Sequence, residues 1–104
     1  MNGTAFEVFE TETFSKLFES LEHRERIWVG KMRVQLKTNP KSGKPLRYTW
    51  FREKKFENKR LYYLVSEKKM KIILAAFGSK KDQQRIIDQI LLNKTEYLEL
   101  LEKI

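Results

Sequence analysis

The sequence predicts an α+β fold in which an N-terminal strand and a helical hairpin pack on an antiparallel β meander, followed by C-terminal helices. Three features of the 104-residue chain predict it. Apolar residues recur at helical spacing between positions 14 and 36, alternate or run together between 50 and 77, and return to helical spacing from 86 onwards. Because this order contains no repeat and no low-complexity linker, we expect a single domain over residues 1–104.

The N-terminal part is predicted to form one strand and two helices. Residues 6–10 alternate between the two faces of a strand, after which the apolar spacing becomes that of a helix. A second helix is expected from about Glu22 to Lys37, and Pro40 and Gly43 mark the turn that follows it. The apolar positions are Phe14, Leu17, Phe18 and Leu21 in the first helix, and Trp28, Met32 and Leu36 in the second.

Three strands are predicted to follow, at residues 50–56, 60–65 and 70–77. The first two alternate, and the third is an almost continuous apolar run typical of a strand buried on both faces. The joints between them are short enough for hairpins, which favours an antiparallel meander. Ser79 with Asp82, and Asn93 with Glu96, then form capping patterns that predict two C-terminal helices.

The positive charge of the chain is concentrated in its middle. The formal net charge is +8, yet residues 1–40 are balanced and residues 82–104 carry a net −2. Residues 41–81 hold thirteen Lys and Arg against three Glu, a net charge of +10. A field of this sign attracts a polyanion, so we expect nucleic acid or an acidic protein as the partner. The alternative, a surface charged for solubility, explains the mixed signs at the two ends better than it explains the middle.

The composition excludes several function classes. Cysteine is absent and the only histidine, His23, lies in a charged stretch, so we expect neither a metal site nor a cofactor. The sequence contains no phosphate-binding glycine loop and no nucleophile motif. The apolar runs are too short to span a membrane, and no secretory signal opens the chain. A cytoplasmic protein without a membrane partner is therefore expected.

Five cations of the basic segment are predicted to gather at one concave surface near the ends of the meander strands. Arg52 and Lys54 share one face of their strand by its two-residue period. Arg60 opens the next strand, and Lys80 and Lys81 follow the end of the third. The side chains predicted to bind RNA beside them, by charge or by stacking on bases, are Lys44, Arg47, Tyr48, Trp50 and Tyr62. For Trp50 and Tyr62, packing against the helices is an equally good interpretation.

At these residues the sequence resembles the RelE/ParE superfamily of toxins from toxin–antitoxin pairs. The segment from Gly43 to Leu46 is similar to the Gly-x-Pro-Leu turn of that family, and residues 50–54 and 59–65 resemble its basic second strand and arginine-led third strand. Residues 70–82 resemble the last strand with its basic exit. The closing helices are most similar to the HigB branch, and the resemblance covers about residues 5–92.

The resemblance implies the toxin of a type II toxin–antitoxin system, one that cleaves messenger RNA on the ribosome without a metal. A ribose 2′-hydroxyl would attack the adjacent phosphate and leave a cyclic phosphate and a free 5′-hydroxyl. Transferred to this sequence, Arg60 is the phosphate-stabilising arginine, Arg52 and Lys54 are the basic pair, and Lys80 or Lys81 is the cation after the last strand. The implied partners are mRNA, the ribosome and a cognate antitoxin, a separate acidic chain.

The sequence departs from the family pattern in the last element, where many members place a Tyr or His as acid or base. This chain has Gln83, Gln84 and Ile86 there. Either a lysine takes that role, or Tyr62 or Tyr97 reaches in from elsewhere, or cleavage is weak or absent. The alternatives are therefore a ParE-like inhibitor that binds a protein target without catalysis, and a non-toxic RNA-binding module.

Overall fold

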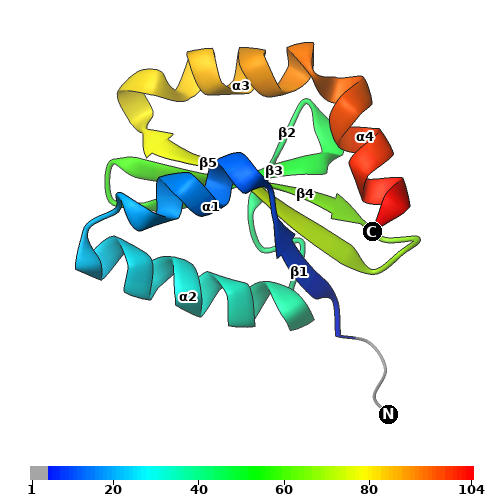
Figure 1. Ribbon diagram of the computed structural model, residues 1–104, viewed down its shortest axis with the longest axis horizontal. Helices are drawn as coiled ribbons and strands as arrows, with labels where there is room; N and C mark the ends of the chain where they lie inside the picture. Colours follow the sequence, from blue (N-terminus) through cyan, green and yellow to red (C-terminus); the bar gives the residue numbers. More distant parts are fainter. Residues whose placement is uncertain (1–4) are drawn as a thin grey trace.

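The computed structural model describes residues 5–104, over which five strands form one mixed sheet between two pairs of helices (Figure 1). The predicted α+β fold is confirmed. The strands are β1 (Glu7–Glu10), β2 (Lys44–Leu46), β3 (Tyr48–Phe56), β4 (Lys59–Ser66) and β5 (Lys71–Ser79). The helices are α1 (Glu12–Glu19), α2 (His23–Thr38), the 3₁₀ turn η1 (Lys80–Asp82), α3 (Gln83–Leu92) and α4 (Lys94–Lys103).

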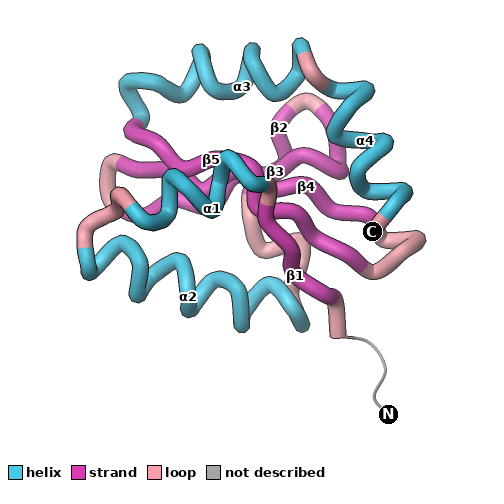
Figure 2. The backbone as a smooth tube through the Cα atoms, in the orientation of Figure 1, coloured by secondary structure: helices cyan, strands magenta, loops and turns pink. Residues whose placement is uncertain are grey.

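The sheet has the strand order β1-β5-β4-β3-β2. Strands β3, β4 and β5 pair as the predicted antiparallel meander. Strand β1 joins the far edge of β5 in parallel, with Glu7 opposite Lys71, so the sheet is mixed (Figure 2). Strand β2 replaces part of the turn expected after α2. Its three residues include Pro45, and so short a strand has no periodicity that a sequence could reveal.

Each face of the sheet carries its own apolar core, because β4 and β5 alternate between the two faces. The core under α1 and α2 contains Phe14, Val29, Leu36, Leu61, Tyr63, Val65, Ile72 and Leu74. The core under α3 and α4 contains Phe51, Tyr62, Leu64, Ile73, Ala75, Ile86, Ile90 and Leu101. The buried run in β5 thus contacts helices on both sides, as its continuous apolar sequence predicted.

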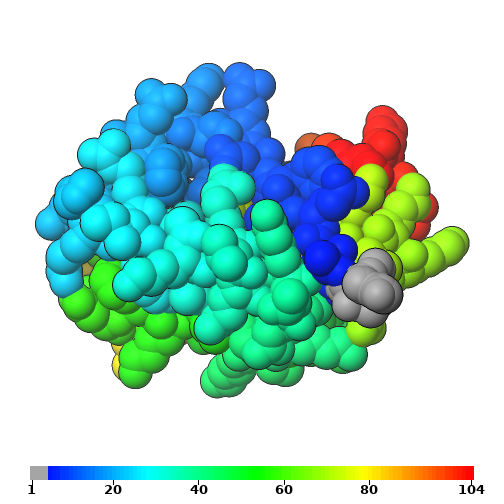
Figure 3. Space-filling model, turned by 90° about the horizontal axis from the view of Figure 1, so that it is seen from below, coloured from blue at the N-terminus to red at the C-terminus, as the bar shows by residue number. Residues whose placement is uncertain are grey.

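Helix α2 begins with a capping box and ends before Pro40. The Glu22 side chain accepts from the backbone N–H three residues on, and the Glu25 carboxylate accepts from the Glu22 N–H at 3.0 Å. The helix buries Val29, Met32 and Leu36, whereas Ile27 and Val34 are exposed. From below (Figure 3), α2 (cyan) crosses the surface and the β3–β4 hairpin (green) lies beside its N-terminal half.

The C-terminal helices differ from the prediction at their starts. The Ser79 hydroxyl contacts the Asp82 carboxylate at 3.2 Å, but one 3₁₀ turn separates Ser79 from α3. The side chain of Asn93 makes no capping bond to α4 and donates instead to the Gln89 carbonyl at 3.1 Å. None of the helices between residues 5 and 104 has both the length and the apolar character that crossing a membrane requires.

Candidate functional site

The described residues form an open hollow of about 440 Å³ where β2, β3 and β4 meet, and four of the side chains lining it are cations. Strand β2 pairs with β3 only as far as Lys44 and Glu53, so the edge of β3 beyond Glu53 has no further partner in the described ladder. Positive charge therefore faces an open sheet edge. We call this surface the basic hollow; its lining is Ser42, Gly43, Lys44, Glu53, Lys54, Lys55 and Arg60.

The register of β3 and β4 decides which cations share a face. Lys55 lies directly opposite Arg60, and Glu53 lies opposite Tyr62. Residues opposite one another in an antiparallel pair point to the same side of the sheet. Lys54 lies opposite Leu61, so its side chain belongs to the other face of the sheet, although Lys54 also lines the basic hollow. The cation that accompanies Arg60 on its own face is therefore Lys55, which the sequence prediction did not include.

Arg60 is held by hydrogen bonds at the wall of the basic hollow and is only 7% exposed. Its Nη1 donates to the carbonyl oxygens of Glu57 and Lys59, at 3.3 and 3.0 Å. Its Nε lies 3.9 Å from Oε2 of Glu53. A guanidinium fixed in this way is preorganised to meet an anion without first losing side-chain freedom.

Glu53 is a buried carboxylate that sequence reasoning missed. Its Oε1 accepts a hydrogen bond of 2.7 Å from the side-chain amide of Gln83, the first residue of α3. This bond joins α3 to β3 beside Arg60. In the sequence Glu53 is one acid among many basic residues, and only the pairing of β3 with β4 reveals that it faces Arg60.

Tyr62 packs against the helices, the second of the two interpretations open for it, and does not offer a face for stacking on bases. Its side chain is fully buried in the core under α3 and α4. Its hydroxyl has no hydrogen-bond partner within residues 5–104. Burial, reinforced by the nearby charge of Glu53, raises the pKa of Tyr62 to about 12.

Tyr97, the other tyrosine considered as acid or base, lies away from the basic hollow. It is on α4 and lines a different hollow of about 490 Å³, together with Thr11, Thr13 and Asn93. Burial raises the pKa of Tyr97 above its ordinary value. Its position in another hollow argues against a role beside Arg60.

Arg52 lies on the opposite face from Arg60, which corrects the prediction that these cations share one surface. It is buried opposite Tyr63. Its guanidinium donates to the carbonyl oxygens of Gly43, Thr49 and Lys41, at 2.8, 3.0 and 3.2 Å. Lys41 and Gly43 belong to the loop before β2, and Thr49 lies at the start of β3. Arg52 therefore stabilises the loop that walls the basic hollow and does not line the hollow itself.

Tyr63 completes this support for the loop before β2. Its hydroxyl accepts from the Gly43 N–H at 2.9 Å and donates to the Pro40 carbonyl at 2.8 Å. A Cβ at Gly43 would lie 2.6 Å from that hydroxyl and 2.6 Å from the Glu53 carbonyl oxygen. Glycine is required here because the backbone passes so close to β3. The Gly-x-Pro-Leu turn thus places Lys44 at the rim of the basic hollow.

Lys80 and Lys81 lie in η1, directly after β5, and are exposed. The N–H of Lys80 donates to the Asn58 carbonyl at 2.7 Å, which brings η1 to the turn between β3 and β4. Arg60 is two residues beyond Asn58. The two lysines are therefore near the N-terminal end of β4, which carries Arg60, but they do not line the basic hollow.

Arg47 forms the turn between β2 and β3, Tyr48 and Trp50 lie at the start of β3, and none of the three lines the basic hollow. The rings of Tyr48 and Trp50 stack with centroids 5.1 Å apart. The ammonium of Lys94 lies 4.7 Å from the centre of the Tyr48 ring. Of the five predicted RNA-binding residues, Lys44 alone lines the basic hollow, among the residues that the structure describes.

The basic hollow contains chemistry for holding an anion and for moving protons, and no set of metal ligands. Within the described range 5–104, no three His, Cys, Asp or Glu side chains come together in a way that could hold a metal ion. The ionisable groups of the hollow are lysines, one arginine and one glutamate. Such a set suits a phosphodiester, whose charge the cations would neutralise.

Solved structures of the E. coli toxin RelE resemble this chain. A free RelE carrying two arginine-to-alanine substitutions matches with a TM-score of 0.68 at 19% identity, over 77% of this chain and 88% of that chain. The same variant bound to a peptide of the antitoxin RelB matches with a TM-score of 0.66 at 18% identity, over 79% of this chain and 94% of that chain. The intact RelBE toxin–antitoxin complex matches with a TM-score of 0.63 at 20% identity, over 72% of this chain and 95% of that chain.

Comparison by sequence gives no match, either to a family profile or to a curated protein. The structural likeness extends over most of both chains at a low level of identity. What this chain and RelE share is therefore a fold. The chain has the RelE-like toxin fold.

Proposed function

We propose that this protein is the toxin of a toxin–antitoxin pair and that it cleaves messenger RNA on the ribosome. The observation that carries the proposal is the basic hollow, in which Lys44, Lys54, Lys55 and Arg60 surround a single carboxylate among the described residues. The RelE-like fold supports it. A phosphate of the RNA backbone would occupy the hollow, because three more positive than negative charges line it.

The proposed reaction is an attack of a ribose 2′-hydroxyl on the adjacent phosphorus. The oxygen–phosphorus bond to the next nucleotide breaks, leaving a cyclic phosphate and a 5′-hydroxyl. Arg60 would stabilise the charge on the phosphorane, since its guanidinium is already fixed. Lys54 and Lys55 are the candidates for proton transfer, because they are the two lysines that β3 contributes to the hollow, next to Arg60 on the neighbouring strand.

The proposed partners are mRNA in the ribosome and an acidic antitoxin. RelE has been solved bound to its antitoxin RelB. For this chain, a separate acidic protein that covers the basic hollow would neutralise the same charges that hold RNA. Its site of action would be the cytoplasm, where translation takes place.

Inducible expression with mapping of RNA 5′ ends tests the proposal. The wild-type protein should arrest growth and produce new 5′ ends inside translated frames. Replacing both Lys54 and Lys55 by Ala should lower cleavage by roughly 100-fold and relieve the arrest. Lys31 and Lys68 are exposed lysines outside the basic hollow, and K31A/K68A removes the same charge as a matched control.

The outcomes separate the hypotheses. Unchanged cuts from K54A/K55A would rule out the basic hollow as the site. K80A/K81A should retain most of the cleavage, because these side chains lie outside the hollow. Arrest with intact RNA and damaged DNA would instead indicate an inhibitor of a protein target.

A second function, RNA binding without cleavage, is favoured by one observation. Gln83 stands at the start of α3, and its side-chain amide donates to Glu53. An amide does not exchange protons in the way that a Tyr or His does. Harmless expression, together with salt-dependent binding of short RNA that K54A/K55A abolishes, would support this function over cleavage.

A further inference from the structure

We infer that Glu25, on a helix outside the basic hollow, is a positioning residue for Arg60. The inference deepens the proposed function and rests on it. Glu25 would act through Lys59, fixing the backbone of the β3–β4 turn whose carbonyl oxygens hold the Arg60 guanidinium. Helix α2 would thereby set the geometry of a site to which it contributes no lining residue among those described.

The first link is an ion pair whose carboxylate is buried and whose ammonium is partly exposed. The Glu25 carboxylate is 3% exposed, and its Oε2 lies 3.0 Å from the ammonium of Lys59 at the start of β4. Its other oxygen accepts from the Glu22 N–H in the capping box. Both oxygens of Glu25 are thus engaged, and the first turn of α2 is tied directly to the strand that carries Arg60.

Two further contacts join the same helix to the same turn. The Arg24 guanidinium donates to Glu57 at 2.5 Å. One helical turn further on, the indole of Trp28 stacks on Phe56 with centroids 4.8 Å apart. Residues on one face of α2 therefore contact the last residue of β3, the turn, and the first residue of β4.

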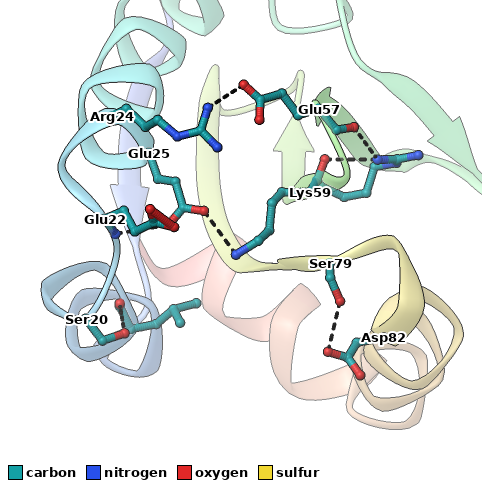
Figure 4. Close-up of polar contacts among 10 residues, drawn as sticks. Ser20, Glu22, Arg24, Glu25, Glu57, Lys59, Ser79 and Asp82 are labelled. Carbon is teal, nitrogen blue, oxygen red and sulfur yellow. Dashed lines mark hydrogen bonds and ion pairs between the residues drawn. The ribbon is translucent and has the colours of Figure 1, made fainter.

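The last link runs through the backbone of the turn. The side chains of Glu57 and Lys59 form ion pairs with α2. The carbonyl oxygens of the same two residues accept from Nη1 of Arg60. Figure 4 shows the arrangement: Arg24 and Glu25 extend from the helix toward Glu57 and Lys59, on whose far side the carbonyl contacts are drawn. A shift of the turn would therefore move the oxygens that orient Arg60.

Stability alone does not explain a charge at position 25. A buried ion pair loses most of its Coulomb attraction to desolvation, and an apolar pair of similar volume is often as stable. In several proteins a buried polar or ionic group selects one geometry at a cost in stability. Here the alternative geometries of the turn would leave Arg60 without its two carbonyl partners.

The experiment follows the Nε–H of Arg60, which shares the planar guanidinium with the Nη1 that donates to the two carbonyl oxygens. In ¹⁵N-labelled protein, the Nε–H signal of Arg60 is assigned by its disappearance in Arg60→Lys. In Glu25→Gln this signal should move toward that of a solvent-exposed arginine, and its exchange with water should accelerate by about tenfold, as expected for loss of one restraining contact. Lys59→Gln keeps the capping box intact and should have the same effect.

RNA cleavage, or RNA binding if the protein does not cleave, supplies the second readout. Glu25→Gln should lower it by roughly 10- to 100-fold, the effect expected when a catalytic group moves by about 1 Å. Combining Glu25→Gln with Arg60→Ala should add nothing to the loss from Arg60→Ala alone, because both changes act through one guanidinium. Val29→Ala, a core change on the same helix, controls for lost stability and should leave the Arg60 signal in place.

Two results would overturn the inference: an Arg60 signal unchanged in both Glu25→Gln and Lys59→Gln, or fully additive losses in the double variant. If Glu25→Gln does not fold, Lys59→Gln decides. The Arg60 signal is recorded without RNA, so it tests the inference even where the wild-type protein neither binds nor cleaves RNA. In that case the proposed function fails and the positioning of Arg60 is still measured.

Discussion

At the scale of single residues, the site region is built from buried polar groups whose roles differ with the face of the sheet. Arg52 and Arg60 are equally buried, at 7% exposure each. Arg52 donates to carbonyl oxygens of the loop before β2 and the start of β3, whereas Arg60 lines the basic hollow. Tyr62 and Tyr63 are adjacent and fully buried, yet only the Tyr63 hydroxyl is hydrogen-bonded within the described chain.

Tyr62→Phe should leave stability at neutral pH unchanged or raise it by about 1 kcal/mol, because it removes a buried hydroxyl that lacks a partner. The pKa of this phenol is raised from 10.0 to about 12 by burial. The folded form therefore holds its proton more tightly than the unfolded form. The contribution of the protonated phenol to folding stability is complete below pH 10 and is lost as the pH rises through 12.

Urea unfolding of both proteins between neutral pH and pH 12 tests this prediction. The wild-type protein should lose stability relative to Tyr62→Phe above pH 10. A variant clearly less stable than wild type at neutral pH would mean that the hydroxyl has a partner, such as a bound water.

At the scale of elements, α2 and the β3–β4 hairpin are joined by the ion pair between Glu25 and Lys59. Burial on its own would raise the pKa of Glu25. The hydrogen bonds from Lys59 and from the Glu22 N–H outweigh that effect, so the pKa lies below its ordinary 4.5. The contribution of this carboxylate to stability is therefore present above pH 4.5 and is lost as the pH falls through the lowered pKa.

Glu25→Gln should lower the free energy of unfolding by roughly 3 kcal/mol at neutral pH, near the lower end for a broken buried pair because Lys59 is partly exposed. Denaturant titrations from pH 7 downward should show the gap to wild type narrowing below pH 4.5. Glu67→Gln removes the carboxylate of an exposed pair with Lys41 and should change stability by less than about 1 kcal/mol. A gap for Glu25→Gln that did not depend on pH would contradict the assignment.

At the scale of the whole molecule, the positive charge of residues 41–81 is divided between surfaces. Lys44, Lys54, Lys55 and Arg60 line the basic hollow, and Lys80 and Lys81 lie on η1. Other cations of the segment form pairs, as Lys41 does with Glu67. The concentration of charge in the sequence therefore overstates the charge at any one surface.

The salt dependence of RNA affinity measures how many of these cations contact phosphate. For a short single-stranded RNA, Lys54→Ala should reduce the slope of log affinity against log salt by about 0.7, the value for one phosphate contact. Lys68→Ala should leave the slope unchanged, because Lys68 lies in the β4–β5 turn outside the basic hollow. Fluorescence anisotropy at several salt concentrations provides the comparison, and equal slopes for the two variants would place RNA elsewhere.

The sequence was sufficient for elements with long, regular patterns and insufficient for their register. The stripes of α1 and the apolar run of β5 were predicted correctly because burial repeats along them. The two-residue period could associate Arg52 with Lys54, but it could not say which β3 residue lies opposite Arg60. That residue is Lys55. A shift of one position exchanges the two faces of a strand, so the composition of the basic hollow depended on a pairing that no local pattern encodes.

The parallel pairing of β1 with β5 has a consequence for how the chain is made. Glu7 meets Lys71, a residue 64 positions later in synthesis. At roughly 5 to 20 residues per second, Glu7 is translated about 3 to 13 seconds before its partner Lys71. The hairpin that carries Arg60 is also complete before that edge can close. A nascent chain therefore acquires the strands of its basic hollow while its own first strand is still unpaired.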